Sequence, residues 1–253
     1  ALDDEVVLDS GDYEGLLDKA LARCDWDKLE SDVLRRRRAG EYVGLGLAMY
    51  VEKSGLGPTD GARINVHTNG DVEVITGGAS VGQGFETVIA QVCAETLGVN
   101  YRRVRVVHGR TDRIEYGLGA HATRATVMTA NAAAVAAVKV RAKALNMAAQ
   151  LLQQDPSSLT IADGNVIRTD GVGASISLGD VAYQLRPASP IRGDRDPGLA
   201  AEGWFTTAHM TYPYGVQIAQ VNVDPGTGAV RVEKMLIAFD VGRAINPMPV
   251  SYT

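Results

Sequence analysis

Cysteine is scarce in this sequence, and the two cysteines that are present stand far apart. The chain has 253 residues but contains only Cys24 and Cys93, each in a segment with a helical pattern and neither in a Cys-x-x-Cys pair. Zinc sites, iron–sulfur clusters and disulfide frameworks need several cysteines at suitable spacing. The sequence therefore argues against all three, and we expect each cysteine to be a small core residue.

Long apolar runs and an excess of positive charge are also missing. No run of about 18 apolar residues appears, so we expect no membrane span. The formal net charge is −5, which argues against a general nucleic-acid binder. The four arginines at positions 35–38 end a predicted helix, where cations oppose the helix dipole. We interpret them as a solvated helix end rather than a nucleic-acid patch.

An initiating methionine and a signal-peptide pattern are absent as well, so we expect a fragment or a processed form. We assign the protein to the cytoplasm and leave the periplasm open as the alternative. Hydrophobic residues make up 45% of the chain, which is enough to bury a substantial core in one large domain or two smaller ones.

The stretch of residues 71–98 contains the first candidate site, because a strand, a glycine-rich loop and a helix follow one another there. The helix is predicted to begin after Gly84. Gly82, Gln83 and Gly84 therefore stand where unpaired backbone N–H groups suit an anion, and the Gln83 amide can both donate and accept hydrogen bonds. The alternative is that these glycines only form a tight turn between strand and helix.

Residues 111–131 contain the second candidate site. Gly117 and Gly119 predict a bent backbone, and the small residues from Ala120 to Thr126 would let a ligand lie against the start of the next helix. The alternative is a helix start with small residues chosen for close packing. The helix itself is predicted to be long and to bury an apolar stripe of Val135, Val138, Ala142, Leu145, Ala149 and Leu152.

Turn-forming residues divide the rest of the chain. Asn69-Gly70 predicts a two-residue β-hairpin, and Asp163-Gly164 and residues 224–228 predict two more. Ser177 is predicted to cap a short helix. Residues 186–199 are rich in Pro, Gly, Arg and Asp, which predicts an exposed connection between lobes.

Three motifs together resemble one protein family. They are GQGFETVIAQVCAETLG from Gly82, GLGAHATRAT from Gly117 with Ala-Asn-Ala after it, and DVGRAINP from Asp240. Over nearly its whole length the chain is similar to the molybdenum-binding large subunit of the xanthine dehydrogenase, aldehyde oxidase and carbon monoxide dehydrogenase family. The second motif departs from the family pattern, because Ala120 and Ala125 replace residues that usually carry hydroxyl groups.

The resemblance implies contacts to a molybdopterin cofactor. The implied cofactor-binding residues are Gly82, Gln83, Gly84, Phe85, Ala120, His121, Ala122, Thr123, Arg124, Thr126, Asp240 and Asn246. Ala122 would lie nearest the metal, while Asp240 and Asn246 would bind the distal part of the cofactor. A turn stabilised by a short polar side chain competes with that role for Asp240. We assign no catalytic residue, because Glu86 and Glu95 fit helix-surface charges better. We assign no metal ligand, because His121 is a lone histidine without a partner at ligand spacing.

The resemblance also implies an α+β fold with two lobes of repeated strand–helix units and mixed sheets. We place the first lobe at residues 1–185, a linker at 186–201 and a truncated second lobe at 202–253. The implied cofactor is molybdopterin, as the cytosine dinucleotide, with molybdenum. With two separated cysteines the chain cannot hold iron–sulfur clusters itself, so [2Fe–2S] and FAD centres are expected on partner chains. The implied partners are the remaining parts of the molybdenum subunit, an iron–sulfur subunit, an FAD subunit and a small-molecule substrate, without nucleic acid.

The implied activity is oxidative hydroxylation of an aldehyde or an N-heterocycle. Family members carry further loops and a general-base glutamate that are not visible in this sequence. We therefore expect the isolated chain to be inactive. The alternative is a non-catalytic or degenerate fragment with a binding or assembly role, which the missing hydroxyl groups at Ala120 and Ala125 favour.

Overall fold

The computed structural model describes residues 7, 8 and 10–247, and the chain forms two compact units. The first unit comprises residues 1–53 and 211–244, and the second comprises residues 54–210 and 245–253. The second unit is therefore inserted into the chain of the first. Among the described residues no helix combines the length and the apolar character needed to cross a bilayer.

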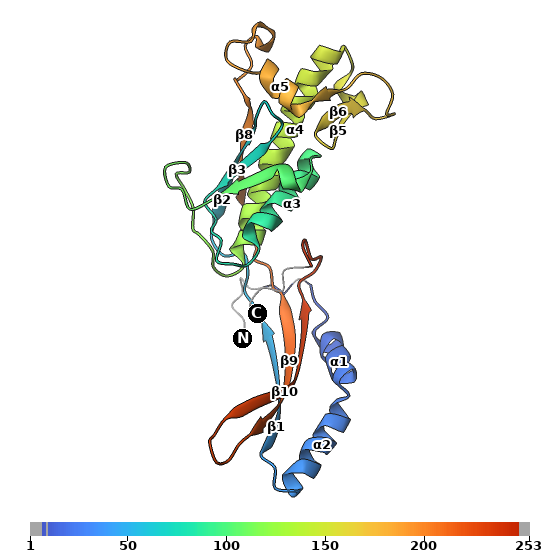
Figure 1. The fold of residues 1–253 in the computed structure, drawn as a ribbon, viewed down its shortest axis with the longest axis vertical. Helices are drawn as coiled ribbons and strands as arrows, with labels where there is room; N and C mark the ends of the chain where they lie inside the picture. The colour runs from blue at the N-terminus through green and yellow to red at the C-terminus, as the bar shows by residue number, and fades with distance from the viewer. Residues whose placement is uncertain (1–6, 9, 248–253) are drawn as a thin grey trace. The chain divides into compact units, whose positions relative to one another are not determined.

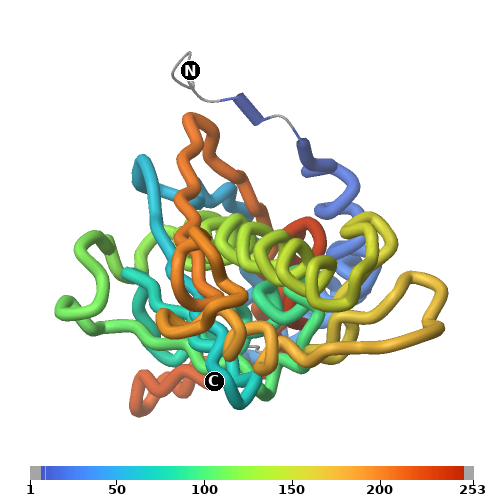
Figure 2. Tube along the Cα trace, turned by 90° about the horizontal axis from the view of Figure 1, so that it is seen from above, coloured from blue at the N-terminus to red at the C-terminus, as the bar shows by residue number. Residues whose placement is uncertain are grey.

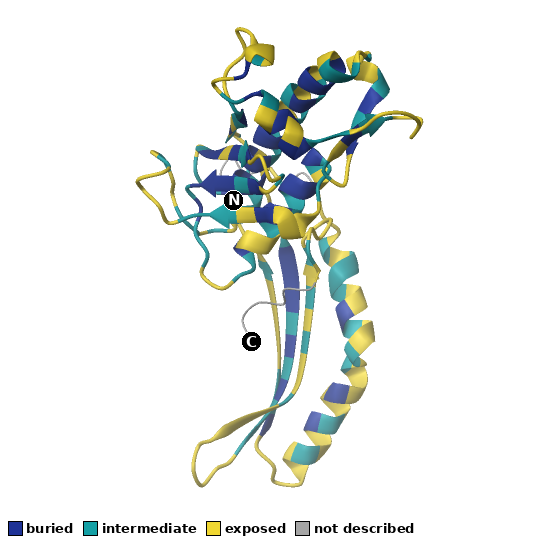
Figure 3. Ribbon diagram, turned by 45° about the horizontal axis from the view of Figure 1, so that its top comes forward, coloured by how far each residue is buried: buried dark blue, intermediate teal, exposed yellow. Residues whose placement is uncertain are grey.

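The first unit is a three-stranded antiparallel sheet with two helices packed on one of its faces (Figure 1). The strands lie in the order β1 (Val43–Val51), β9 (Tyr214–Val223) and β10 (Val230–Asp240), and the helices are α1 (Tyr13–Cys24) and α2 (Trp26–Arg38). The hairpin predicted at residues 224–228 joins β9 to β10. The central strand β9 is largely buried, whereas the two flanking strands are mostly exposed (Figure 3).

The opposite face of this sheet carries exposed apolar side chains. Leu236 and Ala238 of β10 pack towards the helices. Met235, Ile237 and Phe239 alternate with them along the strand, so they point to the other face. Each of these three side chains is about half exposed.

The second unit is built on a four-stranded mixed sheet with two helices. The strands lie in the order β4 (Val104–Val107), β3 (Val72–Thr76), β2 (Thr59–Val66) and β8 (Leu199–Thr206). The pair β3 and β4 is parallel and is connected through α3 (Phe85–Leu97), while the other neighbours are antiparallel. The long helix α4 (Asn131–Leu152), yellow-green in Figure 2, packs against α3, β2 and β8. The mixed sheet and its helices confirm the predicted α+β class.

Smaller elements complete the second unit. They are strands β5 (Leu159–Ala162), β6 (Asn165–Arg168) and β7 (Ile176–Ser177), helix α5 (Leu178–Gln184), the 3-10 turns η1 (Tyr101–Arg103), η3 (Pro156–Ser158) and η4 (Pro190–Arg192), and the π-helix η2 (Ala125–Ala130). The predicted hairpin at Asp163-Gly164 joins β5 to β6. Ser177 caps α5 as predicted, because its side chain accepts a hydrogen bond from the backbone N–H of Asp180.

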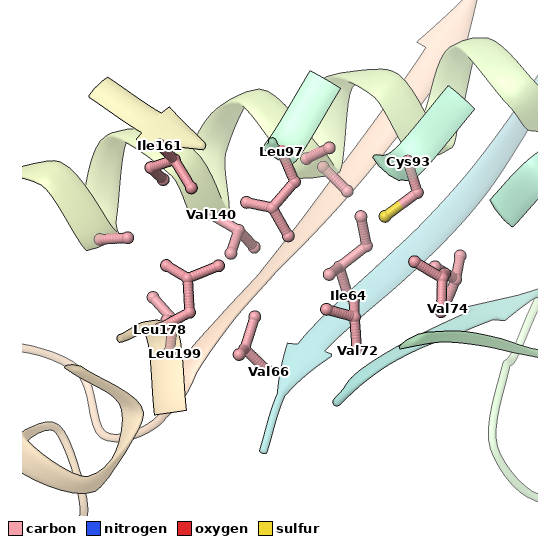
Figure 4. Close-up of a cluster of buried hydrophobic side chains, with 14 of the residues drawn as sticks. Ile64, Val66, Val72, Val74, Cys93, Leu97, Val140, Ile161, Leu178 and Leu199 are labelled. Carbon is pink, nitrogen blue, oxygen red and sulfur yellow. The ribbon is translucent and has the colours of Figure 1, made fainter. Parts of the chain in front are cut away.

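The core of the second unit lies between the sheet and the helices (Figure 4). Ile64 and Val74 of the sheet are 0% exposed and face Cys93 of α3 and Val140 of α4. Burial in these apolar surroundings raises the pKa of the Cys93 thiol to about 12. Cys93 is thus the small core residue that its pattern predicted, and Cys24 packs at the edge of the smaller core in the first unit.

The buried face of α4 differs from the predicted stripe. Val138 is 57% exposed and Leu145 is only partly buried. The face that packs on the sheet carries mainly alanines: Ala132, Ala133, Ala136, Ala137, Ala144 and Ala148. A Cβ on Gly203 of β8 would lie 2.3 Å from the backbone nitrogen of Ala136. The helix crosses the strand so closely that small side chains, rather than the largest apolar ones, define the buried face.

The hairpin at Asn69-Gly70 is confirmed, but its turn is longer than two residues. Ile64 pairs with Val74 and Val66 with Val72, as predicted. The backbone N–H of Gly70 donates to the carbonyl of His67, so the turn begins before Asn69. Of the turn residues only Gly70 has a positive φ, of 83°. The turn therefore does not have the two positive φ angles of the short hairpin type.

The two compact units have other boundaries than the predicted lobes. Strand β8 pairs with β2 from Leu199 to Thr206, so it begins inside the predicted linker and belongs to the second unit. Only residues 211–244 of the predicted second lobe join the first unit, together with residues 1–53. Pairing between strands that are distant along the chain determines these boundaries, and local composition carries no signal of it.

Candidate functional site

The two predicted glycine-rich loops touch each other through their backbones. A Cβ built on Gly77 would lie 2.2 Å from the carbonyl oxygen of Tyr116, and one built on Gly117 would lie 2.4 Å from the carbonyl oxygen of Gly77. The backbone N–H of Gly119 donates to the same Gly77 oxygen at 3.2 Å. Only glycine fits at this contact. The fold therefore brings together the two loops that the sequence identified separately.

Gln83 shapes the first loop through its side chain. Its Oε1 accepts a hydrogen bond from the backbone N–H of Val81 at 2.7 Å, and its Nε2 donates to the carbonyl of Ala79 at 3.1 Å. Gly82 and Gly84 on either side adopt positive φ angles of 95° and 75°. The Gln83 amide was predicted to be available to a ligand, but both of its ends bond to the backbone of its own loop.

The first loop leads directly into the N-terminus of α3. Gly84 is the cap residue of this helix and no side chain caps it. The space where a Cβ would stand on Gly82 is open. Phe85 is buried, with 3% of its surface exposed, and packs edge-on against the His108 ring. The backbone N–H groups, and not the Phe85 side chain, are therefore the surface that this loop presents to an anion.

A polar chain of three residues ties the loop to α3. The Ser80 hydroxyl donates to one Glu86 carboxylate oxygen, and His108 Nε2 lies 2.9 Å from the other. Burial acts to raise the pKa of Glu86, but hydrogen bonds from its own backbone N–H, from His108 and from Ser80 hold that pKa below its usual value. Glu86 is therefore more than the helix-surface charge that the sequence predicts, because it connects the loop to His108.

The second loop contains two residues in an uncommon backbone conformation. Ala122 and Thr123 have φ angles of 44° and 55°. The backbone N–H of Gly55 donates to the carbonyl of Ala122 at 2.8 Å. His121 and Thr123 are exposed, while Ala120 and Thr126 are partly buried. Directly after this loop the chain enters the π-helix η2, a form that is rare overall and frequent at functional sites.

Arg124 stands at the end of the second loop and is fully buried. Its Nη1 is 3.1 Å from the Asp60 carboxylate and donates to the carbonyl of Gly119 at 3.2 Å. Its Nε and Nη2 donate to the carbonyls of Leu56 and Thr59, each at 3.1 Å. Asp60 is not evident as a site residue from the sequence, because its only local signal is a carboxylate at the start of an apolar strand.

Asp240 and Asn246 of the third motif fall in different units. The Asp240 carboxylate accepts hydrogen bonds from the Tyr214 hydroxyl at 2.7 Å and from the backbone N–H of Gly242 at 3.0 Å. These two bonds hold the pKa of Asp240 below its usual value, and the bond to Asp240 raises the pKa of Tyr214. The geometry is that of a turn stabilised by its own aspartate. Asn246 is partly buried.

The donors in these loops suit an anionic organic ligand better than a bare metal ion. No group of three or more His, Cys, Asp and Glu side chains that could hold a metal occurs among the described residues. The two loops present backbone N–H and C=O groups, threonine hydroxyls and small alanines. Such groups can hydrogen-bond phosphate oxygens and a heterocycle and allow close approach. The residues present therefore fit an organic cofactor that brings its own metal.

Together these features define a class of protein: an α+β domain in which two glycine-rich loops are joined by backbone contact beside a helix N-terminus that suits an anionic cofactor. The comparison with known families agrees with this class. Residues 19–252 match the family described as "Molybdopterin cofactor-binding domain". The chain belongs to this family, and the resemblance carried by the three motifs is confirmed.

Several relatives are similar over almost all of this chain. The chain is 36% identical over 240 residues to the 6-hydroxypseudooxynicotine dehydrogenase complex subunit gamma of Paenarthrobacter nicotinovorans, covering 95% of this chain and 30% of that protein. It is 31% identical over 257 residues to the carbon monoxide dehydrogenase large chain of Hydrogenophaga pseudoflava, covering 95% of this chain and 31% of that protein.

Solved structures show the same fold. Quinoline 2-oxidoreductase from Pseudomonas putida 86 superposes with a TM-score of 0.82 at 30% identity, over 95% of this chain and 32% of that chain. Carbon monoxide dehydrogenase from Oligotropha carboxidovorans gives a TM-score of 0.81 at 29% identity, again over 95% of this chain and 32% of that chain. The chain thus spans about a third of the length of the relatives it matches.

Proposed function

We propose that this chain is the cofactor-binding part of a molybdenum hydroxylase that oxidises an aldehyde or an N-heterocycle. The observation that carries the proposal is the backbone contact between Gly77 and Gly117, which unites the two loops in a chain of the molybdopterin-binding family. When bound, the molybdenum cofactor supplies the oxidation–reduction chemistry. The residues of this chain bind and orient it.

The first loop and the start of α3 would hold the anionic part of the cofactor. The backbone N–H groups at Gly82 and Gly84 stand at a helix N-terminus without a side-chain cap, where the helix dipole favours a phosphate. Gln83 would act by fixing the shape of the loop, since both ends of its amide bond to that loop. A pyrophosphate-containing form, such as the cytosine dinucleotide, would use such a site most fully.

The second loop would lie against the pterin and the metal. Ala120 and Ala122 carry no more than a methyl group, which allows close approach, and the exposed Thr123 offers a hydroxyl. Asp240 and Asn246 remain proposed contacts to the distal part of the cofactor. His121 and Thr126 remain proposed contacts through backbone and hydroxyl groups of the second loop, whereas the buried Phe85 would support the first loop from the core.

The proposal includes partner chains. The chain has two cysteines, which are too few for [2Fe–2S] clusters, and two relatives are named as a complex subunit and a large chain. We infer separate iron–sulfur and FAD subunits. The remaining part of the molybdenum subunit would cover the apolar sheet face at Met235, Ile237 and Phe239, because relatives are about three times as long as this chain.

The decisive experiment is metal and pterin analysis of the natively purified protein with its partners. The proposal predicts stoichiometric molybdenum, a pterin released with a cytosine nucleotide, and oxidation of an aldehyde or N-heterocycle. A native complex without molybdenum and pterin would support the alternative, a degenerate binding or assembly fragment, which the alanines at positions 120 and 125 favour. Fractionation of the host cells would test the cytoplasmic location that belongs to the same proposal.

A further inference from the structure

A buried ion pair between Asp60 and Arg124 lies at the end of the second loop. The side chains of Asp60 and Arg124 are both 0% exposed. Thr129 of the π-helix donates its hydroxyl to the carboxylate oxygen that Arg124 contacts, and the backbone N–H of Gly61 donates to the other oxygen at 2.9 Å. Both carboxylate oxygens are therefore satisfied within the protein.

Arg124 is committed to this cluster. Its guanidinium has five N–H donors, and four hydrogen bonds run from it to Asp60, Leu56, Thr59 and Gly119. With no exposed surface, it has no face to offer to a ligand. The side chain that the motif assigned to cofactor binding is thus occupied with protein groups.

The acceptors of Arg124 connect the loop to the sheet. Leu56 and Thr59 precede or begin β2, whereas Gly119 belongs to the second loop. Between Gly119 and Arg124 lie the two residues with positive φ, Ala122 and Thr123. Residues with side chains keep this conformation only where the surrounding structure holds it. The four hydrogen bonds of Arg124 supply that constraint at the end of the loop.

We propose that Asp60, Arg124 and Thr129 form a positioning clamp that presets residues 119–123 for the cofactor, and that Arg124 does not itself contact the cofactor. The effect on the cofactor rests on the proposed function, whereas the effect on the loop does not. The clamp acts through the loop backbone, because its side chains are buried and the loop residues His121 and Thr123 are exposed.

The test compares Arg124→Lys with a control variant that weakens the core elsewhere, in the natively purified protein. Lysine keeps the charge next to Asp60, but one ammonium group cannot reach four acceptors spread over two segments. The control is Met147→Ala, which removes a fully buried side chain from the core around α4. Three quantities are measured: the melting temperature, the hydrogen-exchange rates of the amides at residues 119–124, and the molybdenum content per protein.

We expect exchange at residues 119–124 to be about tenfold faster in Arg124→Lys than in the wild type, because opening of the loop is no longer opposed by the clamp. Molybdenum content should fall below about half in this variant and stay at the wild-type level in Met147→Ala, although stability falls in both. Thr129→Val, which removes one hydroxyl and keeps the shape, should shift exchange in the same direction by a smaller factor. It provides the comparison if Arg124→Lys does not fold.

Three results would overturn the clamp. Wild-type exchange rates in both Arg124→Lys and Thr129→Val would show that the loop holds its shape without it. Loss of molybdenum in Arg124→Lys without faster exchange would show a direct contact to the cofactor instead. Equal molybdenum losses in Arg124→Lys and Met147→Ala would show that the cluster affects the cofactor only through the overall stability of the protein. Absence of molybdenum from the wild type would count against the proposed function, and the exchange rates would still decide whether the clamp sets the loop.

Discussion

The two glycine-rich loops of the second unit are held in different ways. The first loop is closed by its own residues, since Gln83 bonds to Ala79 and Val81. The second loop is held from a distance, because Arg124 bonds to Asp60, which is 64 positions earlier in the chain. Local closure lets a loop adjust to a ligand on its own, whereas a buried clamp makes the loop as stable as the core to which it is tied. Substitutions should therefore affect the two loops to different degrees.

The largest expected effect comes from breaking the distant clamp. Asp60→Ala should lower the free energy of unfolding by about 3–5 kcal/mol, because it leaves the Arg124 guanidinium buried without its counter-ion. Urea unfolding measures this change. Asp71→Ala is the matched control, since Asp71 pairs with Arg103 at an exposed site and should cost at most about 1 kcal/mol. Similar losses in the two variants would contradict the buried clamp as the stronger anchor.

The contact between the two loops should give the next largest effect. In Gly117→Ala the new Cβ would meet the Gly77 carbonyl oxygen at 2.4 Å, so the loops must move apart at a cost of about 1–3 kcal/mol. Thermal unfolding would report this loss. The control Gly46→Ala adds a Cβ to β1 where no atom lies within 4 Å, and it should leave stability unchanged or slightly raised. An unchanged melting temperature in Gly117→Ala would show that the two loops can move apart at this contact without loss of stability.

Breaking the local closure should have a smaller effect. Gln83→Ala removes two hydrogen bonds from a partly exposed loop and should cost about 1 kcal/mol, with faster hydrogen exchange confined to the Val81 amide. Gln83→Glu keeps an acceptor for Val81 and loses the donor to Ala79, so its exchange should lie between wild type and Gln83→Ala. Faster exchange at residues 119–124 in either variant would show that the Gln83 hydrogen bonds hold the second loop as well as the first.

The smallest expected effect is a pH dependence from Glu86. Its pKa in the folded protein lies below the usual 4.5, so its hydrogen bonds contribute stability that is fully present above about pH 4.5 and is lost as the pH falls through the folded-state pKa. Glu86→Gln should flatten this part of the stability curve. Melting temperatures between about pH 6 and pH 3.5 would measure it, with Glu95→Gln on the exposed side of α3 as control. A curve that keeps its slope in Glu86→Gln would assign the dependence to other groups.

Much of the local structure of the first loop could be predicted from the sequence. The strand, the loop and helix α3 follow one another over a short stretch, and each leaves its own pattern of valines, glycines or helical spacing. Gly84 stands at the helix start as the sequence predicted. Local signals sufficed here because the loop is closed by local hydrogen bonds.

The second loop depends on contacts that the sequence does not reveal. Its glycines and alanines form a visible pattern, but no residue near Arg124 in the sequence indicates Asp60 as its partner. The buried face of α4 differs from the predicted stripe for a related reason, since its close crossing of Gly203 selects alanine over larger apolar residues. In both cases the residue that determines the local structure, Asp60 or Gly203, is distant in the sequence. Neither the periodicity nor the composition of the local segment therefore indicates it.

The insertion of the second unit between β1 and β9 has a consequence for how the protein folds. Pairing Val51 with Tyr214 closes a loop of roughly 160 residues, which carries a large entropic cost while that loop is a random chain. Pairing of Thr59 with Thr206 inside the second unit shortens the flexible part of that loop to roughly 15 residues and lowers the closure cost by about 2 kcal/mol. We therefore expect the inserted unit to form first and to act as the template that brings β1 and β9 together.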